Sequence, residues 1–439
     1  MTAKDLIASI QLEKKQAVEA GIQREEKPLG AVTDNEAPYK LPQDWEWCHL
    51  GDYAMKVTDY VASGSFASLK ENVLITNDEN YAVMVKTADF SNGFTKNLTY
   101  TDKHGYDFLE NSNLSGGELI LSNIGSIGKV FIVPDLGRPM TLASNTIMVR
   151  MTHSEYNRYM YYLFVSPYGQ KLLKSISSGT SVLKFNKTQL KATVIPVAPL
   201  EEQNKICNTL DQLQSIISKR EEELKKLDEL IKARFVELFG SIRNNKYGYE
   251  VMTLQDVCEP IKDGTHQTPT YTEDIINGYK FLSSKDVTSG KVDWTHLKYI
   301  PAELHNELYK RISPRKGDIL LAKNGTTGVA AIVDRDEVFD IYVSLALLRP
   351  LSIVTSEYLC SAVNSIETKH QFDSSLKGIG VPNLHLGEIK KTKIVVPPIE
   401  AQEKFADFVR QVDKSKAAVQ KSLDETQLLF DSLMQKYFG

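Results

Sequence analysis

The side chains of this chain that could do chemistry do not form a catalytic motif. A phosphate-binding loop of the form G-x-x-x-x-G-K-[ST] is absent from the sequence. Gly378-Ile379-Gly380 is followed by Asn383 where a dinucleotide-binding fingerprint needs its third glycine. Ser166-Pro167-Tyr168 only faintly resembles an amino-methyltransferase motif, and we interpret it as an interruption in a helix. No spacing of His, Cys, Asp or Glu demands a metal or a catalytic dyad.

What remains is the chemistry of recognition by polar residues on short loops. Lys, Arg, Asn, Gln, Ser and Thr on glycine-supported loops can form hydrogen bonds with a polar partner, and lysines can bind its anionic groups. In the first half of the chain, the candidate recognition residues are Ser65, Lys86, Asn123, Lys129, Thr180 and Lys184. In the second half, they are Lys262, Thr265, His266, Gln267, Thr268, Lys285, Lys323, Asn324, Thr326, Thr327, Lys377 and Asn383.

Ordinary structural roles stay open for these candidates. His266 fits a hydrogen-bonding residue better than a metal ligand, and Gln267 or Asn383 could cap a turn. Four of the lysines could equally be ordinary solvent-exposed residues, namely Lys86, Lys129, Lys262 and Lys285. The sequence alone therefore predicts polar loops, and their contact with DNA depends on the resemblance given below.

Two long helical patterns must position these loops. From Pro199 to Gly240, apolar residues recur at alternating steps of four and three, which is typical of a coiled-coil seam. Arg220 and Arg234 fall on the same seam. At 1.5 Å per residue, this helix would be roughly 60 Å long. The pattern returns without a gap from Pro398 to Gly439, and both copies begin with P-[LI]-E-x-Q and end with F-G.

The segments between the helices repeat as well. Gly117-Glu118-Leu119-Ile120-Leu121 corresponds to Gly317-Asp318-Ile319-Leu320-Leu321, and Gly125-Ser126-Ile127-Gly128 corresponds to Gly325-Thr326-Thr327-Gly328. In the first half, short β-rich runs, a helix over 154–176 and a closing strand over 189–197 predict a mixed domain. A long interval between two matching helices indicates duplicated half-molecules rather than a solenoid.

We therefore predict an α/β (α+β) protein with two similar globular domains, two long helices and an internal pseudo-twofold. The predicted parts are an N-terminal helix and linker over 1–40, a first domain over 41–198, a central helix over 199–240, a second domain over 241–397 and a C-terminal helix over 398–439.

Composition is that of an ordinary globular protein, with 42% hydrophobic and 25% charged residues. The net charge of −4 argues mildly against a protein coated in nucleic acid, but local basic loops decide DNA binding. No apolar run is long enough for a membrane span, and the N-terminus lacks an apolar signal core, so we expect a cytoplasmic location. The four cysteines lie far apart and are expected to be buried apolar residues.

Taken together, these motifs resemble the specificity subunit of type I restriction-modification systems. The resemblance rests on the repeated P-[LI]-E-x-Q…F-G helix, on L-P-x-x-W-E-W-x-x-L-G at 41–51, on Asp263 to Pro269 and on Gly317 to Gly328, and it covers essentially the whole chain. Where the second domain has Asp263 to Pro269, the first has Thr58 to Phe66. This departure predicts that the two domains read different half-sites.

The resemblance implies that each globular domain is a target recognition domain that reads one half of a split sequence in double-stranded DNA. It implies that the long helices pair as an antiparallel coiled coil, set the gap between the half-sites and dock methyltransferase subunits. The chain would be non-catalytic and without a cofactor of its own. Its expected partners are two adenine-modifying methyltransferase subunits, which use S-adenosylmethionine, and restriction/translocase subunits, which use ATP and Mg²⁺.

Two other functions stay open on the sequence alone. A similar specificity chain could serve a fused methyltransferase-nuclease, which the neighbouring reading frame would decide. Alternatively, the heptads could belong to a scaffold whose globular domains never touch DNA. Salt-sensitive DNA binding would distinguish the scaffold from a DNA-reading subunit.

Overall fold

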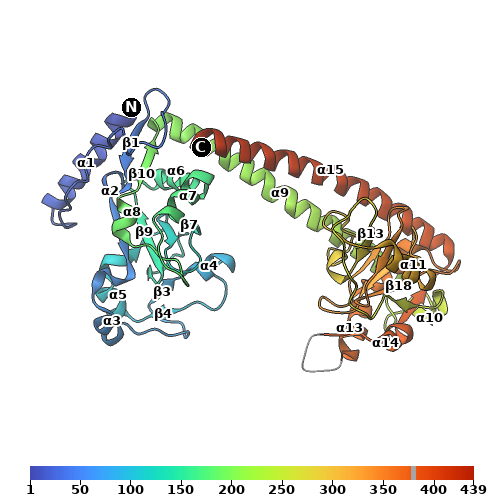
Figure 1. Ribbon diagram of the computed structural model, residues 1–439. Coiled ribbons are helices and arrows are strands. Elements are labelled where there is room, and N and C mark those ends of the chain that lie inside the picture. The colour runs from blue at the N-terminus through green and yellow to red at the C-terminus, as the bar shows by residue number, and fades with distance from the viewer. Residues whose placement is uncertain (377–381) are drawn as a thin grey trace. The chain divides into compact units, whose positions relative to one another are not determined.

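The computed structural model describes residues 1–376 and 382–439, and these form two compact units (Figure 1). The first unit holds Met1–Ser218 together with Leu423–Gly439, and the second holds Lys219–Ser422. Each unit therefore combines one globular domain with parts of both long helices, α9 (Leu200–Phe239) and α15 (Ile399–Phe438).

The first globular domain, from β1 to β10, contains three small sheets. A four-stranded antiparallel sheet has the order β2-β9-β6-β7, a second has the order β4-β3-β8-β5, and β1 pairs with β10. In the second sheet β3 and β8 are parallel, whereas all other pairs are antiparallel. The strands are β1 (Glu46–His49), β2 (Lys56–Asp59), β3 (Ala82–Val85), β4 (Tyr100–Thr101), β5 (Asn113–Leu114), β6 (Leu119–Ser122), β7 (Val130–Ile132), β8 (Met140–Leu142), β9 (Thr146–Arg150) and β10 (Val194–Val197).

Short helices complete this domain, and the helix α1 precedes it. The principal core includes residues of α1, β6, β9 and α6, together with Ile206 and Leu210 of α9 and Met434 and Phe438 of α15. The helices are α1 (Ala3–Glu19), α2 (Leu50–Tyr53), α3 (Phe66–Asn72), α4 (Thr87–Ser91), α5 (Lys103–Phe108), α6 (Ser154–Val165), α7 (Pro167–Ser175) and α8 (Lys187–Lys191), with 3₁₀ turns at Tyr60–Ser63 and Glu110–Ser112.

The second globular domain, from β11 to β19, has the same plan. Its sheets have the orders β12-β18-β15-β16, β14-β13-β17 and β11-β19, and β13 is parallel to β17. The strands are β11 (Glu250–Thr253), β12 (Lys262–Asp263), β13 (Tyr279–Leu282), β14 (Lys298–Ile300), β15 (Ile319–Ala322), β16 (Ala330–Ile332), β17 (Phe339–Ile341), β18 (Leu345–Leu348) and β19 (Lys393–Val396). The helices are α10 (Leu254–Val257), α11 (Ala302–Arg311), α12 (Ser356–Val363), α13 (Ile366–Ser375) and α14 (Leu386–Lys391), with a 3₁₀ turn at Ser284–Asp286.

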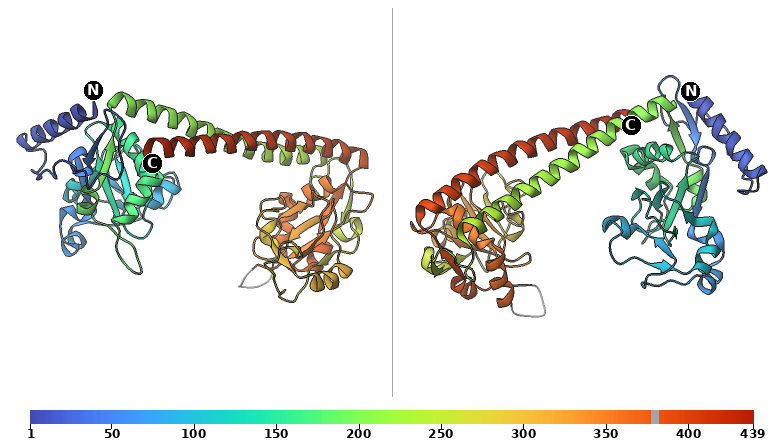
Figure 2. Two further views of the ribbon diagram at one scale, coloured as in Figure 1. Left: turned by 45° about the horizontal axis from the view of Figure 1, so that its top comes forward. Right: turned by 180° about the vertical axis from the view of Figure 1, so that it is seen from behind.

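The strand order and the single parallel pair of the first domain therefore recur in the second, except that β5 has no counterpart among the described residues there. This confirms the prediction of two similar mixed domains. Within each unit, α9 and α15 also lie side by side (Figures 1 and 2). In the second unit Asp228 of α9 meets Lys416 of α15, and further along α9 the Phe235 ring lies 5.6 Å from the ring of Phe405. From the first contact to the second, the residue number rises along α9 and falls along α15, so the two helices are antiparallel.

Burial along the two helices follows the predicted seam. Every seam position of α9 and α15 is buried or half-buried, including the polar breaks Arg220, Arg234 and Lys416. The heptad pattern therefore located the packed face correctly. The Arg234 guanidinium lies over the Phe408 ring, 5.9 Å from its centroid, so its charge sits against an aromatic face on the seam.

The glutamine of each P-[LI]-E-x-Q motif ties a long helix to its globular domain. The buried Gln402 amide donates to the Pro397 and Ile353 carbonyls at 2.8 and 2.9 Å and accepts from the Thr355 amide at 2.9 Å. Gln203, also buried, donates to the Ala198 carbonyl at 2.8 Å and shares a hydrogen bond with the Tyr53 hydroxyl. A buried amide needs such hydrogen-bond partners. The glutamine therefore fixes the start of each long helix relative to the last strand of its domain.

The F-G ends have an equally local reason. Phe239 and Phe438 are fully buried in their units. Gly240 has φ +67°, and a Cβ there would lie 2.6 Å from the Asn244 carbonyl oxygen. A glycine in the left-handed conformation just after the last helical residue is the common way to end an α-helix.

Two details of the first half differ from the sequence predictions. The helix predicted over 154–176 is two helices, because Ser166 caps α7 through the Gly169 amide and Pro167 takes its first position. This confirms the interruption at Ser166-Pro167. The closing strand predicted over 189–197 is wrong before Val194: an Asn186–Gln189 capping box starts α8 there.

The four cysteines are buried and free, as predicted from their spacing. Burial raises the pKa of the Cys207 thiol to about 11 and that of the Cys48 thiol to about 12, so neither is a ready nucleophile at neutral pH. Among the described residues, no helix is both long and apolar enough to cross a membrane. In the same residues, His, Cys, Asp and Glu form no group of three or more that could hold a metal ion.

Candidate nucleic-acid interface

The polar loops of the first domain meet at one end of the β2-β9-β6-β7 sheet. Ile124, just after β6, forms an antiparallel bridge with Lys184, and the Phe185 amide donates to the Asn123 carbonyl at 3.1 Å. The Asn123 amide donates in turn to the carbonyl of Asn145, just before β9. The loop after β6 and the segment before α8 thus form one junction, which we call the first loop junction.

The second domain builds the same junction from different residues. Asn324, just after β15, bridges to Asn383, and the Leu384 amide donates to the Lys323 carbonyl at 2.8 Å. The Lys323 amide donates to the Ser344 carbonyl at 2.9 Å. Because this second loop junction repeats the bonding of the first, the two sets of candidate residues occupy equivalent places in their domains.

Beneath each junction, an aspartate ends the first strand of the four-stranded sheet. Asp59 of β2 is opposite Ile147 of β9, which is itself opposite Leu121 of β6. Asp263 of β12 is opposite Ala346 of β18, which is opposite Leu321 of β15. Since Leu121 and Leu321 correspond in the sequence repeat, the registers make Asp59 and Asp263 equivalent.

The two aspartates are neutralised by lysines from different elements. Lys187, the first residue of α8, donates to Asp59 at 2.9 Å. Asp263 instead receives the Lys323 ammonium at 2.7 Å from the end of β15. The second pair is the more enclosed, with side chains 7% and 5% exposed for Lys323 and Asp263, against 34% and 15% for Lys187 and Asp59.

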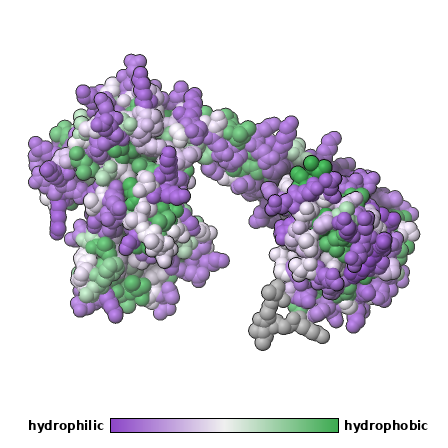
Figure 3. Space-filling model, in the orientation of Figure 1, coloured by the Kyte–Doolittle hydropathy of each residue, from purple (hydrophilic) through white to green (hydrophobic). Residues whose placement is uncertain are grey.

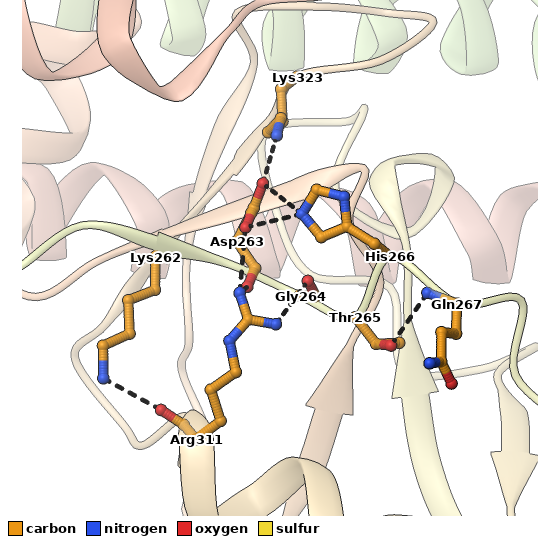
Figure 4. Close-up of polar contacts among 8 residues, drawn as sticks. All are labelled: Lys262, Asp263, Gly264, Thr265, His266, Gln267, Arg311 and Lys323. Atoms are coloured by element: carbon orange, nitrogen blue, oxygen red, sulfur yellow. Dashed lines mark hydrogen bonds and ion pairs between the residues drawn. The ribbon is translucent and has the colours of Figure 1, made fainter.

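Asp263 is the centre of a larger polar cluster (Figure 4). His266 Nε2 lies 3.3 Å from its carboxylate, and the Arg311 guanidinium lies 3.3 Å from the same oxygen atom, Oδ1. Arg311 also donates to the main-chain carbonyls of Asp263 and Gly264 at 3.0 and 3.3 Å. Lys262 donates to the Arg311 carbonyl at 3.1 Å. The cluster therefore ties α11, β12 and β15 to the loop that begins at Gly264.

The charge state of Asp263 follows from these contacts. Burial alone would raise its pKa, but the Lys323 ammonium and the His266 ring together hold the pKa below the ordinary value of a carboxyl. Asp263 is thus ionised at neutral pH, and His266 faces an anion.

The candidates of the second domain divide into exposed and enclosed side chains. Lys323 is buried in its ion pair, and Thr265 is buried by a bridge to Tyr342, so neither side chain projects freely. Lys285 lies beside the junction, because the neighbouring Ser284 amide donates to the Ser344 hydroxyl at 3.0 Å. The exposed candidates are Lys262, His266, Gln267, Thr268, Lys285 and Thr326, while Asn324, Thr327 and Asn383 are half-buried. Lys377 lies outside the described residues.

The candidates of the first domain are more scattered. Ser65 caps α3 through the Ser68 amide at 3.2 Å. Lys86 donates to the Asn97 carbonyl and the Thr99 hydroxyl at 2.9 and 2.7 Å, and it lines a surface cavity of about 530 Å³. Asn123, Thr180 and Lys184 belong to the first loop junction. Lys129 is exposed at the far end of the loop that starts at Asn123.

Sequence reasoning missed four members of these clusters, namely Asp59, Lys187, Asp263 and Arg311. Asp59 and Lys187 are 128 positions apart, and nothing in the sequence pairs them. Arg311, with its side chain 49% exposed, ends a helix far from the Asp263 motif. The signal in the sequence that could have pointed to it is the basic pair Lys310-Arg311, which lies at the end of α11. Figure 3 shows that hydrophilic residues cover most of the visible face of each domain.

Comparison with known proteins places this geometry in one class. The sequence profile of the type I restriction modification DNA specificity domain matches residues 42–227 and 246–426. The chain therefore belongs to the type I restriction-modification DNA specificity domain family, with two copies of the domain.

Two curated relatives match most of the chain. It is 25% identical over 394 residues to the type I restriction enzyme MjaVIII specificity subunit of Methanocaldococcus jannaschii, covering 85% of this chain and 87% of that protein. It is 24% identical over 329 residues to the EcoBI specificity subunit of Escherichia coli, covering 68% and 69%.

Solved structures share the fold. The type I restriction-modification S subunit from M. genitalium gives a TM-score of 0.52 at 15% identity, covering 94% of this chain and 99% of that chain. A chain from a study of complex assembly and conformational transition in a type I R-M system gives a TM-score of 0.53 at 18% identity, covering 91% and 99%.

Proposed function

We propose that this chain is the DNA-reading specificity subunit of a type I restriction-modification complex and makes or breaks no bond itself. Each globular domain reads one half of a bipartite target in double-stranded DNA. The observation that carries this proposal is the duplicated loop junction, in which equivalent polar loops meet at the same edge of the same sheet in both domains. Membership of the type I restriction-modification DNA specificity domain family supports DNA as the partner of these loops.

The junctions supply the recognition groups. Exposed hydrogen-bonding side chains suit base edges: His266, Gln267, Thr268 and Thr326 in the second domain, and Thr180 in the first. Exposed cations suit phosphates, which are Lys129, Lys184, Lys262, Lys285 and Arg311. Internal contacts hold Ser65, Lys86, Asn123, Thr265, Lys323, Asn324 and Asn383, and Thr327 is half-buried, so these residues shape the loops. Because the residues around Asp59 and Asp263 differ, the two half-sites differ.

The catalytic chemistry belongs to the partners in this proposal. Two methyltransferase subunits bring S-adenosylmethionine and flip an adenine within each half-site. Restriction/translocase subunits bring ATP and Mg²⁺. The outward faces of α9 and α15 dock the methyltransferases, and the complex works in the cytoplasm.

A methylation map tests the proposal. The chain would be expressed with its neighbouring methyltransferase gene in cells that lack other methylation, and every modified adenine would be located. We expect one split motif with two different halves and a fixed unread gap. Replacement of residues 41–198 should then change one half alone. A complex that forms but leaves DNA unmodified or modifies it without sequence preference would refute the DNA-reading role.

The antiparallel helices act as the ruler for the gap, with half-sites about 34–36 Å apart from centre to centre. Insertion of one heptad at matching places in α9 and α15 lengthens the pair by roughly 10 Å. The unread gap should lengthen while both half-sites stay the same. An unchanged gap in a complex that still methylates DNA would contradict the ruler.

A further inference from the structure

The side chain of His266 is well exposed although its ring is anchored. Its side chain is 68% exposed, yet Nε2 is held 3.3 Å from the buried carboxylate of Asp263. In Figure 4 the second ring nitrogen, Nδ1, points away from that carboxylate, and it has no hydrogen-bond partner among the described residues. The ring thus has one occupied nitrogen and one that faces outward.

The anchor sets which nitrogen carries the proton. Asp263 is an acceptor, so the neutral imidazole must place its proton on Nε2 to donate to it. Nδ1 then has a free lone pair and can only accept. A buried lysine at 2.7 Å holds the anchor itself in place, and the Arg311 guanidinium fixes its main chain. The outward group of His266 is therefore a positioned hydrogen-bond acceptor.

We propose that His266 reads one base of the second half-site by accepting a hydrogen bond at Nδ1 from an exocyclic amino group, and that Asp263 is its positioning residue. In the major groove the amino donors are N6 of adenine and N4 of cytosine, whereas guanine and thymine present acceptors at the corresponding place. Each base pair carries one such donor, on its A or on its C, so His266 distinguishes the strand that holds the A or C from the strand that holds the T or G. This inference rests on the proposed function, because it assumes that the second domain contacts DNA.

The first domain lacks this device. Three residues after its equivalent carboxylate, Asp59, stands Ala62 rather than a histidine, and Lys187 is the one ion-pair partner of Asp59 among the described residues. An imidazole-based acceptor is therefore specific to the second half-site. This makes the first half-site an internal control, because a variant at 263 or 266 that still folds and assembles must leave it unchanged.

The test is a methylation map of the assembled complex for the wild-type chain and for His266→Ala, His266→Gln, His266→Lys and Asp263→Asn. We expect His266→Ala to relax one A or C position of the second half-site by roughly tenfold in discrimination. His266→Gln should retain part of the preference, because its amide can donate to Asp263 and accept at the outward oxygen. His266→Lys, which only donates, should not retain it.

Asp263→Asn tests positioning, and because it leaves the buried Lys323 without its counter-charge, continued methylation with a normal first half-site reports that the chain still folds and assembles. An asparagine keeps the shape of the side chain but no longer forces the ring proton onto Nε2, so the same base position should relax as in His266→Ala while the first half-site is read normally. Asp59→Asn is the matched control and must leave the second half-site unchanged.

Three outcomes would overturn the inference. The first is an unchanged second half-site in His266→Ala. The second is relaxation spread over several base pairs of the second half-site rather than confined to one. The third is relaxation by His266→Ala but not by Asp263→Asn. That result would mean that His266 reads the base without being positioned by Asp263. If the wild-type complex shows no split motif at all, the proposed function has failed rather than this inference alone.

Discussion

The two domains solve one electrostatic problem in two ways. Each ends its first sheet strand on an aspartate, yet Lys187 neutralises Asp59 from α8, while Lys323 neutralises Asp263 from β15. When the two repeats are aligned, each of these lysines is replaced by an uncharged residue in the other domain. Where the second domain has Lys323, the first has Asn123, and where the first has Lys187, the second has Leu386.

The difference teaches that the ion pair beneath the loops is kept while its surroundings are free to change. A buried carboxylate without a partner is costly, so a cation must come from one of the elements that meet there. Which element supplies it decides which positions of the loops remain for other residues. In the second domain, this arrangement leaves room for His266 and Arg311 on the open side of Asp263.

The largest effect is expected from breaking the enclosed pair. Lys323→Met leaves Asp263 buried without its main counter-charge and should lower the free energy of unfolding of the second unit by about 3–5 kcal/mol. Denaturant unfolding followed by fluorescence would measure it. The double variant Lys323→Asn with Leu386→Lys copies the arrangement of the first domain and should recover part of the loss. No recovery would mean that the two arrangements are not interchangeable.

A smaller loss is expected at the helix junctions. Gln402→Ala removes three hydrogen bonds to main-chain groups, each of which contributes about 0.5–1.5 kcal/mol net. Gln203→Ala frees one carbonyl and the Tyr53 hydroxyl, so its unfolding midpoint should fall less. The exposed neighbour Glu403→Ala serves as the control. Equal losses at the two glutamines would contradict this ranking.

The helix ends should differ in the same measurement. Gly240→Ala forces a Cβ into the left-handed region and to 2.6 Å from the Asn244 carbonyl, so we expect a loss of about 1–2 kcal/mol or more. At Gly439 the nearest atom to an added Cβ is 3.6 Å away, so Gly439→Ala should cost less. A neutral Gly240→Ala would show that the turn after α9 adjusts freely.

The smallest effect should appear at Arg311. Arg311→Ala should weaken binding to all DNA sequences alike and reduce the slope of log K against log salt by about 0.9, the value for one phosphate contact. Binding titrations of the complex at several salt concentrations would measure it. Arg335→Ala is the control, because Arg335 follows β16 at the end of the sheet opposite the loop junction. A changed base preference with an unchanged slope would instead mean that Arg311 acts through Asp263 and His266 and makes no phosphate contact.

The sequence could predict what depends on period and repetition. Local sequence patterns predict the seam positions, the duplicated domains and the F-G helix ends. The burial of the seam side chains follows the predicted pattern. The sequence could not predict that Lys323 is buried, because a lysine on a polar glycine-rich loop looks solvated until the fold brings Asp263 beside it from 60 positions away. The Asp59–Lys187 ion pair could not be predicted for the same reason, because two residues that lie far apart in the chain leave no shared pattern in the sequence.

The central claim is that each domain reads its half-site independently. The most direct measurement is a methylation map for a chain in which the first domain, residues 41–198, is replaced by a copy of the second, residues 241–397. The account predicts that the split motif becomes an inverted repeat of the second half-site with the gap unchanged. Continued methylation of the original asymmetric motif, or a motif in which both halves change, would contradict it.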